Sequence, residues 1–247
     1  MSEPSSQMNF QFNAIATVES CYKQKFAIPR QSGLAPSGQA RIRFFPPYDD
    51  PQAFVGIEDA SHLWIQFVFH QSMIDSWRPS IRPPRLGGNK KMGVFASRSN
   101  FRPNPIGLSV VKLEGVDLSD GVLLSVSGID LLDQTPVLDI KPYVPYADRI
   151  DYAENRFAPS EPSNCQVLFS SQAEKDLAAD KESGNLRSLI TEVLRQDPRP
   201  AYQDVDTNRV YGTRLAHVNL CWRYQVDGDL FHIEVLSLQD EVESPRG

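Results

Sequence analysis

The sequence is poor in the features that mark several large classes of protein. Its three cysteines, Cys21, Cys165 and Cys221, lie far apart and form no C-x-x-C pair, which argues against a disulfide framework and a structural zinc site. No apolar run approaches the roughly eighteen residues of a membrane helix, and the first ten residues lack the basic-then-apolar order of a secretory signal. We therefore expect three reduced, largely buried thiols, no membrane association and a cytoplasmic location.

The common catalytic signatures are missing as well. The chain has no G-x-x-x-x-G-K-[ST] phosphate loop, no G-x-G-x-x-G, no G-x-S-x-G and no H-E-x-x-H. Its four histidines are scattered, and although His62 and His70 have the even spacing of one strand face, a structural role is the favoured interpretation. We predict no metal site.

Acidic residues are absent from one long stretch. The whole chain has 25 basic and 31 acidic residues, a net charge of −6, but the acidity is concentrated after residue 150. Between Ser76 and Leu113 there is no Asp or Glu, while eight Lys and Arg residues occur there. This stretch predicts an anion-attracting surface, and the alternative is a solvated loop whose charges are answered by acids from elsewhere in the fold.

The first 150 residues favour β-structure. Short runs rich in Val, Ile and Phe occur at residues 12–18, 39–45, 63–69, 92–96, 107–113 and 122–126. Prolines lie densely between them, and an interior proline costs a helix about 3 kcal/mol. Many short strands without regular strand-helix alternation favour a closed or sandwiched antiparallel sheet. We predict a mainly β fold with a small antiparallel β-barrel over residues 10–150.

A different pattern begins at residue 151. Residues 151–164 have the polar, proline-containing composition of a linker, and residues 165–238 are predicted to form a smaller α+β domain. Ser171 is expected to cap one helix that runs through Ala179, with Glu174 in capping-box position, and a second, amphipathic helix is expected at 186–194. Strands are expected at 215–226 and 230–236, joined by a hairpin at Asp227-Gly228-Asp229.

Two alternating patterns in the proline-rich loops place polar groups on common faces. Arg98, Asn100, Arg102 and Asn104 alternate, which gives two guanidinium groups and two amides on one side of an extended chain. Asp139, Lys141 and Tyr143 alternate too, and they are interpreted either as a functional cluster or as an ion pair with a packed tyrosine. Periodicity alone does not identify a ligand for either group.

Four motifs together resemble a known family. They are PRQSGL at 29–34, RPPRLGG at 82–88, GVFASRSNFRPNPIGLS at 93–109 and DLLDQTPVLDIKPYVPYAD at 130–148. In order and spacing they are similar to the TsaA-like family, which includes the bacterial tRNA (adenine-37) N6-methyltransferases. DPRPAY at 197–202 and the following Tyr211-Gly212 resemble the C-terminal extension of the bacterial members. One departure is Gln134, where the family has a glycine that is free to adopt φ > 0.

The resemblance implies a barrel that binds S-adenosylmethionine, forms a homodimer and methylates N6 of threonylcarbamoyl-adenine 37 of threonine tRNA. On this view Asp139 is the first candidate for the base, with Tyr143 and Lys141 behind it, since N6 must lose a proton as it is methylated. The residues expected to wall the cofactor site are Pro29, Arg30, Gln31, Arg98, Asn104, Leu138, Asp139, Ile140, Lys141 and Tyr143.

For tRNA, the expected phosphate contacts are Arg82, Arg85, Lys90, Lys91 and Arg102. Arg199 and Tyr202 are expected to stack on an unpaired base, the alternative being that they anchor a buried turn. A C-terminal domain devoted to tRNA also predicts that a chain ending near residue 159 folds and binds the cofactor. Two other functions stay open: a non-catalytic RNA-binding barrel, and a methyltransferase on the same barrel that acts on a small molecule.

Overall fold

A closed six-stranded barrel forms the first half of the protein. The computed structural model describes residues 8–73, 77–83, 91–161, 165–182, 184–199, 203–228 and 230–240. All barrel neighbours are antiparallel, in the order β1-β2-β7-β6-β3-β8, and β8 returns to β1. The strands are β1 (Ala16–Ser20), β2 (Gln39–Phe44), β3 (His62–Val68), β6 (Ile106–Asp117), β7 (Leu123–Ser127) and β8 (Thr135–Pro142). The predicted mainly β fold with an N-terminal antiparallel barrel is confirmed.

Alternating side chains explain the barrel's interior. In β3 the inward residues Leu63 and Ile65 are fully buried, whereas Trp64 between them is only half-buried. Ile42, Leu124 and Val137 meet them from the other strands. The strand expected at 92–96 is wrong: only β5 (Met92–Gly93) is extended, it pairs with β4 (Ser80–Ile81), and residues 94–96 form the 3₁₀ turn η5 (Val94–Ala96). The remaining short elements are η1 (Pro51–Phe54), η2 (Ile57–Asp59), η3 (His70–Ser72) and α1 (Pro145–Asp148).

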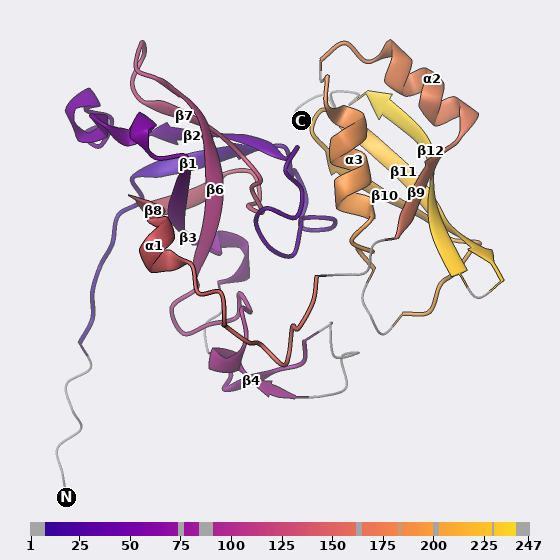
Figure 1. The fold of residues 1–247 in the computed structure, drawn as a ribbon, viewed down its shortest axis with the longest axis horizontal. Coiled ribbons are helices and arrows are strands. Elements are labelled where there is room, and N and C mark those ends of the chain that lie inside the picture. Colours follow the sequence, from indigo (N-terminus) through magenta and orange to yellow (C-terminus); the bar gives the residue numbers. More distant parts are fainter. Residues whose placement is uncertain are drawn as a thin grey trace, which may run out of the picture.

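The C-terminal unit, residues 165–240, is a four-stranded sheet with two helices. The sheet order is β10-β11-β12-β9, in which β12 and β9 are parallel and the other pairs antiparallel. The elements are β9 (Gln166–Phe169), α2 (Ser171–Ala179), α3 (Leu186–Leu194), β10 (Val210–Leu215), β11 (Val218–Asp227) and β12 (Leu230–Asp240). Figure 1 shows α3 on the side of the sheet that faces the barrel.

Two expectations for the C-terminal unit need correction. Ser170, rather than Ser171, caps α2, because its hydroxyl accepts a hydrogen bond from the Ala173 amide at 3.1 Å. The single strand expected at 215–226 is divided by a tight turn at Ala216, whose φ of 53° ends β10 and reverses the chain into β11. The expected hairpin between β11 and β12 is confirmed.

The barrel and the C-terminal unit share one hydrophobic core. Tyr22, just after β1, forms an antiparallel bridge with Leu215, and both are buried. Phe26 stacks on Trp222 with ring centroids 5.7 Å apart. Because removal of residues 165–240 would expose these barrel side chains to water, the core argues against the expectation that a chain ending near residue 159 folds normally.

The remaining general expectations concern thiols, membranes and metals. All three cysteines are free; Cys165 is buried and Cys21 and Cys221 are half-buried. Burial raises the pKa of the Cys21 thiol to about 11, so this group is protonated at neutral pH. None of the helices in the described ranges has the length and apolar character of a membrane span. Within those same ranges there is no group of three metal-ligating side chains.

Candidate cofactor and RNA site

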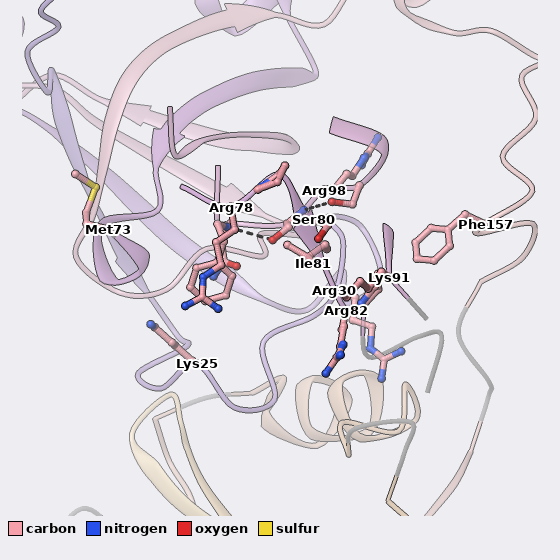
Figure 2. Close-up of a pocket in the computed structure, with 16 residues that line it drawn as sticks. Lys25, Arg30, Met73, Arg78, Ser80, Ile81, Arg82, Lys91, Arg98 and Phe157 are labelled. Carbon is pink, nitrogen blue, oxygen red and sulfur yellow. Dashed lines mark hydrogen bonds between the residues drawn. The ribbon is translucent and has the colours of Figure 1, made fainter. Parts of the chain in front are cut away.

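A wide basic cleft lies beside the barrel. Its volume is about 1660 Å³, and it is lined by six basic residues. Among the described residues its lining contains no Asp or Glu, so the charged side chains that face the cleft are all positive. Apolar contact is offered by Phe101 and by Met73 and Phe157, of which the last two are labelled in Figure 2. The basic residues are Lys25, Arg30, Arg78, Arg82, Lys91 and Arg98.

The cleft is larger than an ordinary small-molecule site. Ligand pockets commonly measure about 300–1,000 Å³, so this cleft has room for a cofactor and part of a larger substrate. Phe157 reaches it from the segment that was expected to be only a linker, which gives that segment a part in the lining. Lys25 and Arg78 were also not singled out; Arg78 lies within the acid-free stretch, whereas nothing in the sequence around Lys25 indicates this position.

Residues 27–38, which include the expected cofactor residues Pro29, Arg30 and Gln31 and are called here the cofactor loop, reach the cleft at Arg30. The Arg98 guanidinium donates a hydrogen bond to the Gln31 side chain, which joins the PRQ motif to the acid-free stretch. Arg30 also lines the cleft, and its guanidinium donates to the backbone oxygen of Asp197 at 3.2 Å. The loop includes Gly33 at φ +80°, a conformation that favours glycine.

Asp130 lies beneath this loop and was not predicted as a site residue. Its carboxylate accepts a hydrogen bond from the Ser109 hydroxyl at 2.6 Å and another from the Ser32 backbone. Burial raises the pKa of the Asp130 carboxyl to about 6, and the nearby Arg98 charge opposes the shift. Asp130 therefore ties strand β6 to the cofactor loop.

Asp139, Lys141 and Tyr143 lie at the outer surface of the barrel. Asp139 and Lys141 form an ion pair at 2.6 Å, and the Asp139 side chain is 44% exposed. Tyr143 lies against Trp64 with ring centroids 5.8 Å apart, and the Trp64 indole donates to Asp148 at 2.9 Å. The ion pair and the packed tyrosine of the structural interpretation are therefore present, and the Asp139 carboxylate is partly exposed to solvent.

A β-bulge shapes this part of β8. Gln66 pairs with Asp139 but Phe67 pairs with Val137, so Leu138 is the extra residue. Ile140 pairs with buried Ile65 and packs against the core, which leaves mainly its backbone for a ligand. Bulges of this kind re-aim side chains next to functional sites.

The predicted cofactor residues fall into two groups. Arg30 and Arg98 line the cleft and Gln31 joins them, with Pro29 in the same loop. Asp139, Lys141 and Tyr143 are not part of the described cleft lining. Asn104 is exposed just before β6, where its backbone oxygen accepts a hydrogen bond from the Ile106 amide.

Two of the predicted RNA contacts line the cleft, and three lie outside the described residues. Arg82 and Lys91 line the cleft, while Arg85, Lys90 and Tyr202 lie outside the described residues. Arg102 donates to the backbone oxygens of Ser97 at 2.8 Å and Val94 at 3.2 Å, so it also stabilises the loop that carries Arg98.

Arg199 differs from the expectation of an exposed stacking group. Its side chain is 15% exposed and pairs with Asp197 at 3.0 Å. The guanidinium also lies 5.0 Å from the centre of the Phe231 ring. These contacts correspond to the alternative interpretation, in which the residue anchors a turn.

Comparisons with known proteins agree across both halves of the chain. Residues 17–149 match the family described as tRNA-methyltransferase O N-terminal domain, and residues 162–241 match the TrmO C-terminal domain. The tRNA (adenine(37)-N6)-methyltransferase of Escherichia coli (strain K12) is 47% identical over 231 residues, which are 92% of this chain and 98% of that protein. A Pseudomonas aeruginosa relative, named for S-adenosylmethionine-dependent methyl transfer, is 47% identical over 88% of this chain and 94% of its own.

A solved structure extends the likeness to three dimensions. The crystal structure of TrmO from Pseudomonas aeruginosa superimposes with a TM-score of 0.76 at 39% sequence identity. The superposition covers 94% of this chain and 99% of that one. The similarity therefore includes the C-terminal unit as well as the barrel.

Proposed function

The chain belongs to the tRNA-methyltransferase O family, and we propose that it uses S-adenosylmethionine to methylate N6 of adenine 37 in tRNA. The observation that carries this proposal beyond family membership is the acid-free basic cleft, whose lining includes cofactor-loop residue Arg30. A cleft of this charge attracts a phosphate backbone, and its size suits an RNA loop better than a metabolite alone.

Arg78, Arg82 and Lys91 are proposed to hold phosphates of the anticodon stem-loop. They line the cleft and come from the β4–β5 hairpin and its flanks. Each phosphate contact that is lost lowers the salt dependence of binding by roughly 0.7–0.9 in logarithmic slope. Because these contacts carry no base information, their loss weakens affinity for different tRNAs to similar extents.

The residues at the cofactor loop fit S-adenosylmethionine by their chemistry. Arg98, held by Gln31, offers a cation for an amino-acid carboxylate, and the backbone of the loop offers donors and acceptors for an adenine. When bound, this cofactor supplies a methyl group on a positively charged sulfur. The chain's part is alignment of the two reactants, which contributes on the order of 7–11 kcal/mol to lowering a barrier.

Asp139 is proposed to accept the proton that N6 loses. One of its oxygens is held by the Ile140 amide at 2.9 Å, and the other pairs with Lys141. This arrangement fixes the direction of a carboxylate that is still open to solvent. A positioned base adds typically 10²–10⁴-fold to a rate.

Three finer assignments complete the proposal. The substrate is threonylcarbamoyl-adenine in threonine tRNA, and the enzyme acts in the cytoplasm. It works as a homodimer, for which the outer face of β6 offers a contact surface, since Ile106 is 39% and Leu108 is 54% exposed there. Apolar side chains placed side by side on an exposed strand favour association with another surface.

Mass spectrometry of tRNA nucleosides from strains with and without the gene tests the function directly. The strain without it is expected to lack one methyl group on threonylcarbamoyl-adenosine, and the purified protein with S-adenosylmethionine is expected to restore that group. Unchanged nucleosides together with methylation of a small molecule would favour the metabolite enzyme. Binding of tRNA without binding of S-adenosylmethionine would favour the non-catalytic module.

A further inference from the structure

The cofactor loop is held by the C-terminal unit at its last residues. Glu192 of α3 accepts two hydrogen bonds from Ser37, one from its backbone amide at 2.8 Å and one from its hydroxyl at 3.0 Å. Asn185, at the start of the same helix, donates to the Ser37 backbone oxygen at 3.1 Å. Both polar backbone groups of Ser37 are therefore satisfied by α3.

The C-terminal end of α3 and the turn after it contact the loop at two earlier positions. Gln196 and Arg195 donate to the Leu34 backbone oxygen at 3.4 and 3.5 Å. Arg30, in the PRQ motif, donates to the backbone oxygens of Asp197 and Arg199 at 3.2 and 3.5 Å. These contacts occur at positions 30, 34 and 37, so they follow the loop along its length.

The partner surface is itself fixed. Five apolar residues of α3 are buried, which seats the helix between the sheet and the barrel (Figure 1). The Asp197 carboxylate accepts hydrogen bonds from Arg199 and from the Tyr224 hydroxyl, the latter at 2.8 Å. Residues 197–199 thus form an anchored turn that presents backbone oxygens to Arg30.

The loop itself has little regular structure. It contains no strand or α-helix, and Ala27 at its start has a φ of 70°, which costs a non-glycine residue of order 1 kcal/mol. On the barrel side, Gly33 donates to the Gly128 backbone oxygen at 2.8 Å. A segment of this kind keeps one conformation when its surroundings hold it, and pre-ordering of a binding loop raises affinity by reducing the entropy lost on binding.

We propose that α3 and the turn after it hold the cofactor loop in its binding conformation, with Glu192 as the main positioning residue. The C-terminal unit then contributes to S-adenosylmethionine binding without touching the cofactor. This inference rests on the proposed function in one respect, the assignment of residues 27–38 to cofactor binding. It reverses the expectation that a C-terminal domain devoted to tRNA leaves cofactor binding almost unchanged when it is absent.

The test uses three variants of the full-length protein. Glu192→Ala removes the two carboxylate oxygens that accept hydrogen bonds from the Ser37 amide and hydroxyl. Ser37→Ala removes only the hydroxyl contact, and Arg187→Ala is the control. Arg187 is on the same helix, but its side chain is exposed and pairs with Glu174 of α2. S-adenosylmethionine affinity is measured by calorimetry, tRNA affinity by filter binding, Tm by scanning calorimetry, and kcat and KM for both substrates from initial rates.

The expected result is a split between the two substrates. Glu192→Ala raises the Kd and KM for S-adenosylmethionine about tenfold, and Ser37→Ala raises them about threefold, because they remove two and one of these hydrogen bonds. At saturating S-adenosylmethionine, kcat stays within twofold of wild type, and so does the tRNA Kd of the cofactor-free protein. Arg187→Ala leaves all of these values within twofold.

Two results would overturn the proposal. A lower Tm with unchanged S-adenosylmethionine affinity in Glu192→Ala and Ser37→Ala would show that the helix serves stability alone. Weaker tRNA binding with unchanged cofactor affinity would make α3 an RNA surface instead. If Glu192→Ala does not fold, Ser37→Ala decides between these outcomes. The affinity of the wild-type protein for S-adenosylmethionine is measured first. A wild-type protein that fails to bind S-adenosylmethionine would refute the proposed function itself, independently of the variants.

Discussion

Gln134 is expected to reduce the stability of the protein through its backbone. It lies in the turn that leads into β8, with a φ of 62°, and its side chain is exposed. The backbone N–H of Gln134 donates a hydrogen bond to the Val18 backbone oxygen at 2.7 Å, so the turn is tied to β1 in this conformation. A left-handed conformation costs a residue with a Cβ atom about 1–2 kcal/mol, because the Cβ crowds the following carbonyl oxygen.

Gln134→Gly removes this cost but also gives the unfolded chain more freedom, which offsets roughly 0.5–1 kcal/mol. The net expectation is a gain of about 0.5–1 kcal/mol in the free energy of unfolding, or about 1–4 °C in Tm for a protein of this size. Gln134→Ala is the matched control, since it shortens the side chain but keeps the Cβ.

Urea denaturation of the three proteins, with the slope of the transition compared among them, measures the effect. The glycine variant is expected to be more stable than both of the others. If the alanine variant is as stable as the glycine variant, the backbone conformation of residue 134 is not the cause and the reasoning is refuted.

Three further predictions concern the barrel and the site. Burial raises the pKa of the Asp130 carboxyl to about 6, so this group binds more protons in the folded than in the unfolded state between pH 4 and 6. Its contribution to the free energy of unfolding should therefore fall by about 1–3 kcal/mol as pH rises through this range; in urea titrations at several pH values, the difference between wild type and Asp130→Asn should change by that amount, and a constant difference would contradict the assignment. Gly107→Ala should destabilise the barrel by about 1–3 kcal/mol, because the new Cβ would lie 2.2 Å from the Phe67 ring. Gly115→Ala is the control, since its Cβ in the same strand meets nothing within 4 Å and the variant should be nearly as stable as wild type. Equal melting curves for the two variants would contradict the steric explanation. Asp139→Asn should lower kcat about 100-fold and leave the S-adenosylmethionine Kd within twofold in single-turnover and calorimetric measurements, and an unchanged kcat would exclude Asp139 as the base.

The sequence predicts the barrel because most of its strands are local apolar runs. Strand β8 was missed as a strand, since Pro136, Asp139 and Lys141 interrupt the apolar pattern and the segment is recognisable only by its motif. The turn at Ala216 was missed because alanine is not a usual residue for a left-handed φ. In both places the surrounding strands, rather than the local residues, decide the backbone conformation.

The candidate site shows the same division. Arg30, Gln31 and Arg98 were found from loop composition and family motifs, and Figure 2 shows Arg30 and Arg98 at the cleft. The contact between Ser37 and Glu192 joins residues 155 positions apart, and no local pattern predicts it. Arg199 shows the converse: the local sequence suggests an exposed stacking group, whereas Tyr224 and Phe231, distant in the sequence, lie against its guanidinium.

The strand order of the C-terminal sheet has a consequence for synthesis on the ribosome. The barrel has all its strands once β8 has been made, but β12, the last of the strands in the described residues, lies between β9 and β11. The sheet that supports α3 therefore stays incomplete while roughly 100 further residues are translated, which takes about 5–20 s at 5–20 residues per second. During that interval a nascent barrel exposes Tyr22, and its cofactor loop has the barrel-side contact of Gly33 with Gly128 but not yet its contacts with α3, which depend on the completed sheet.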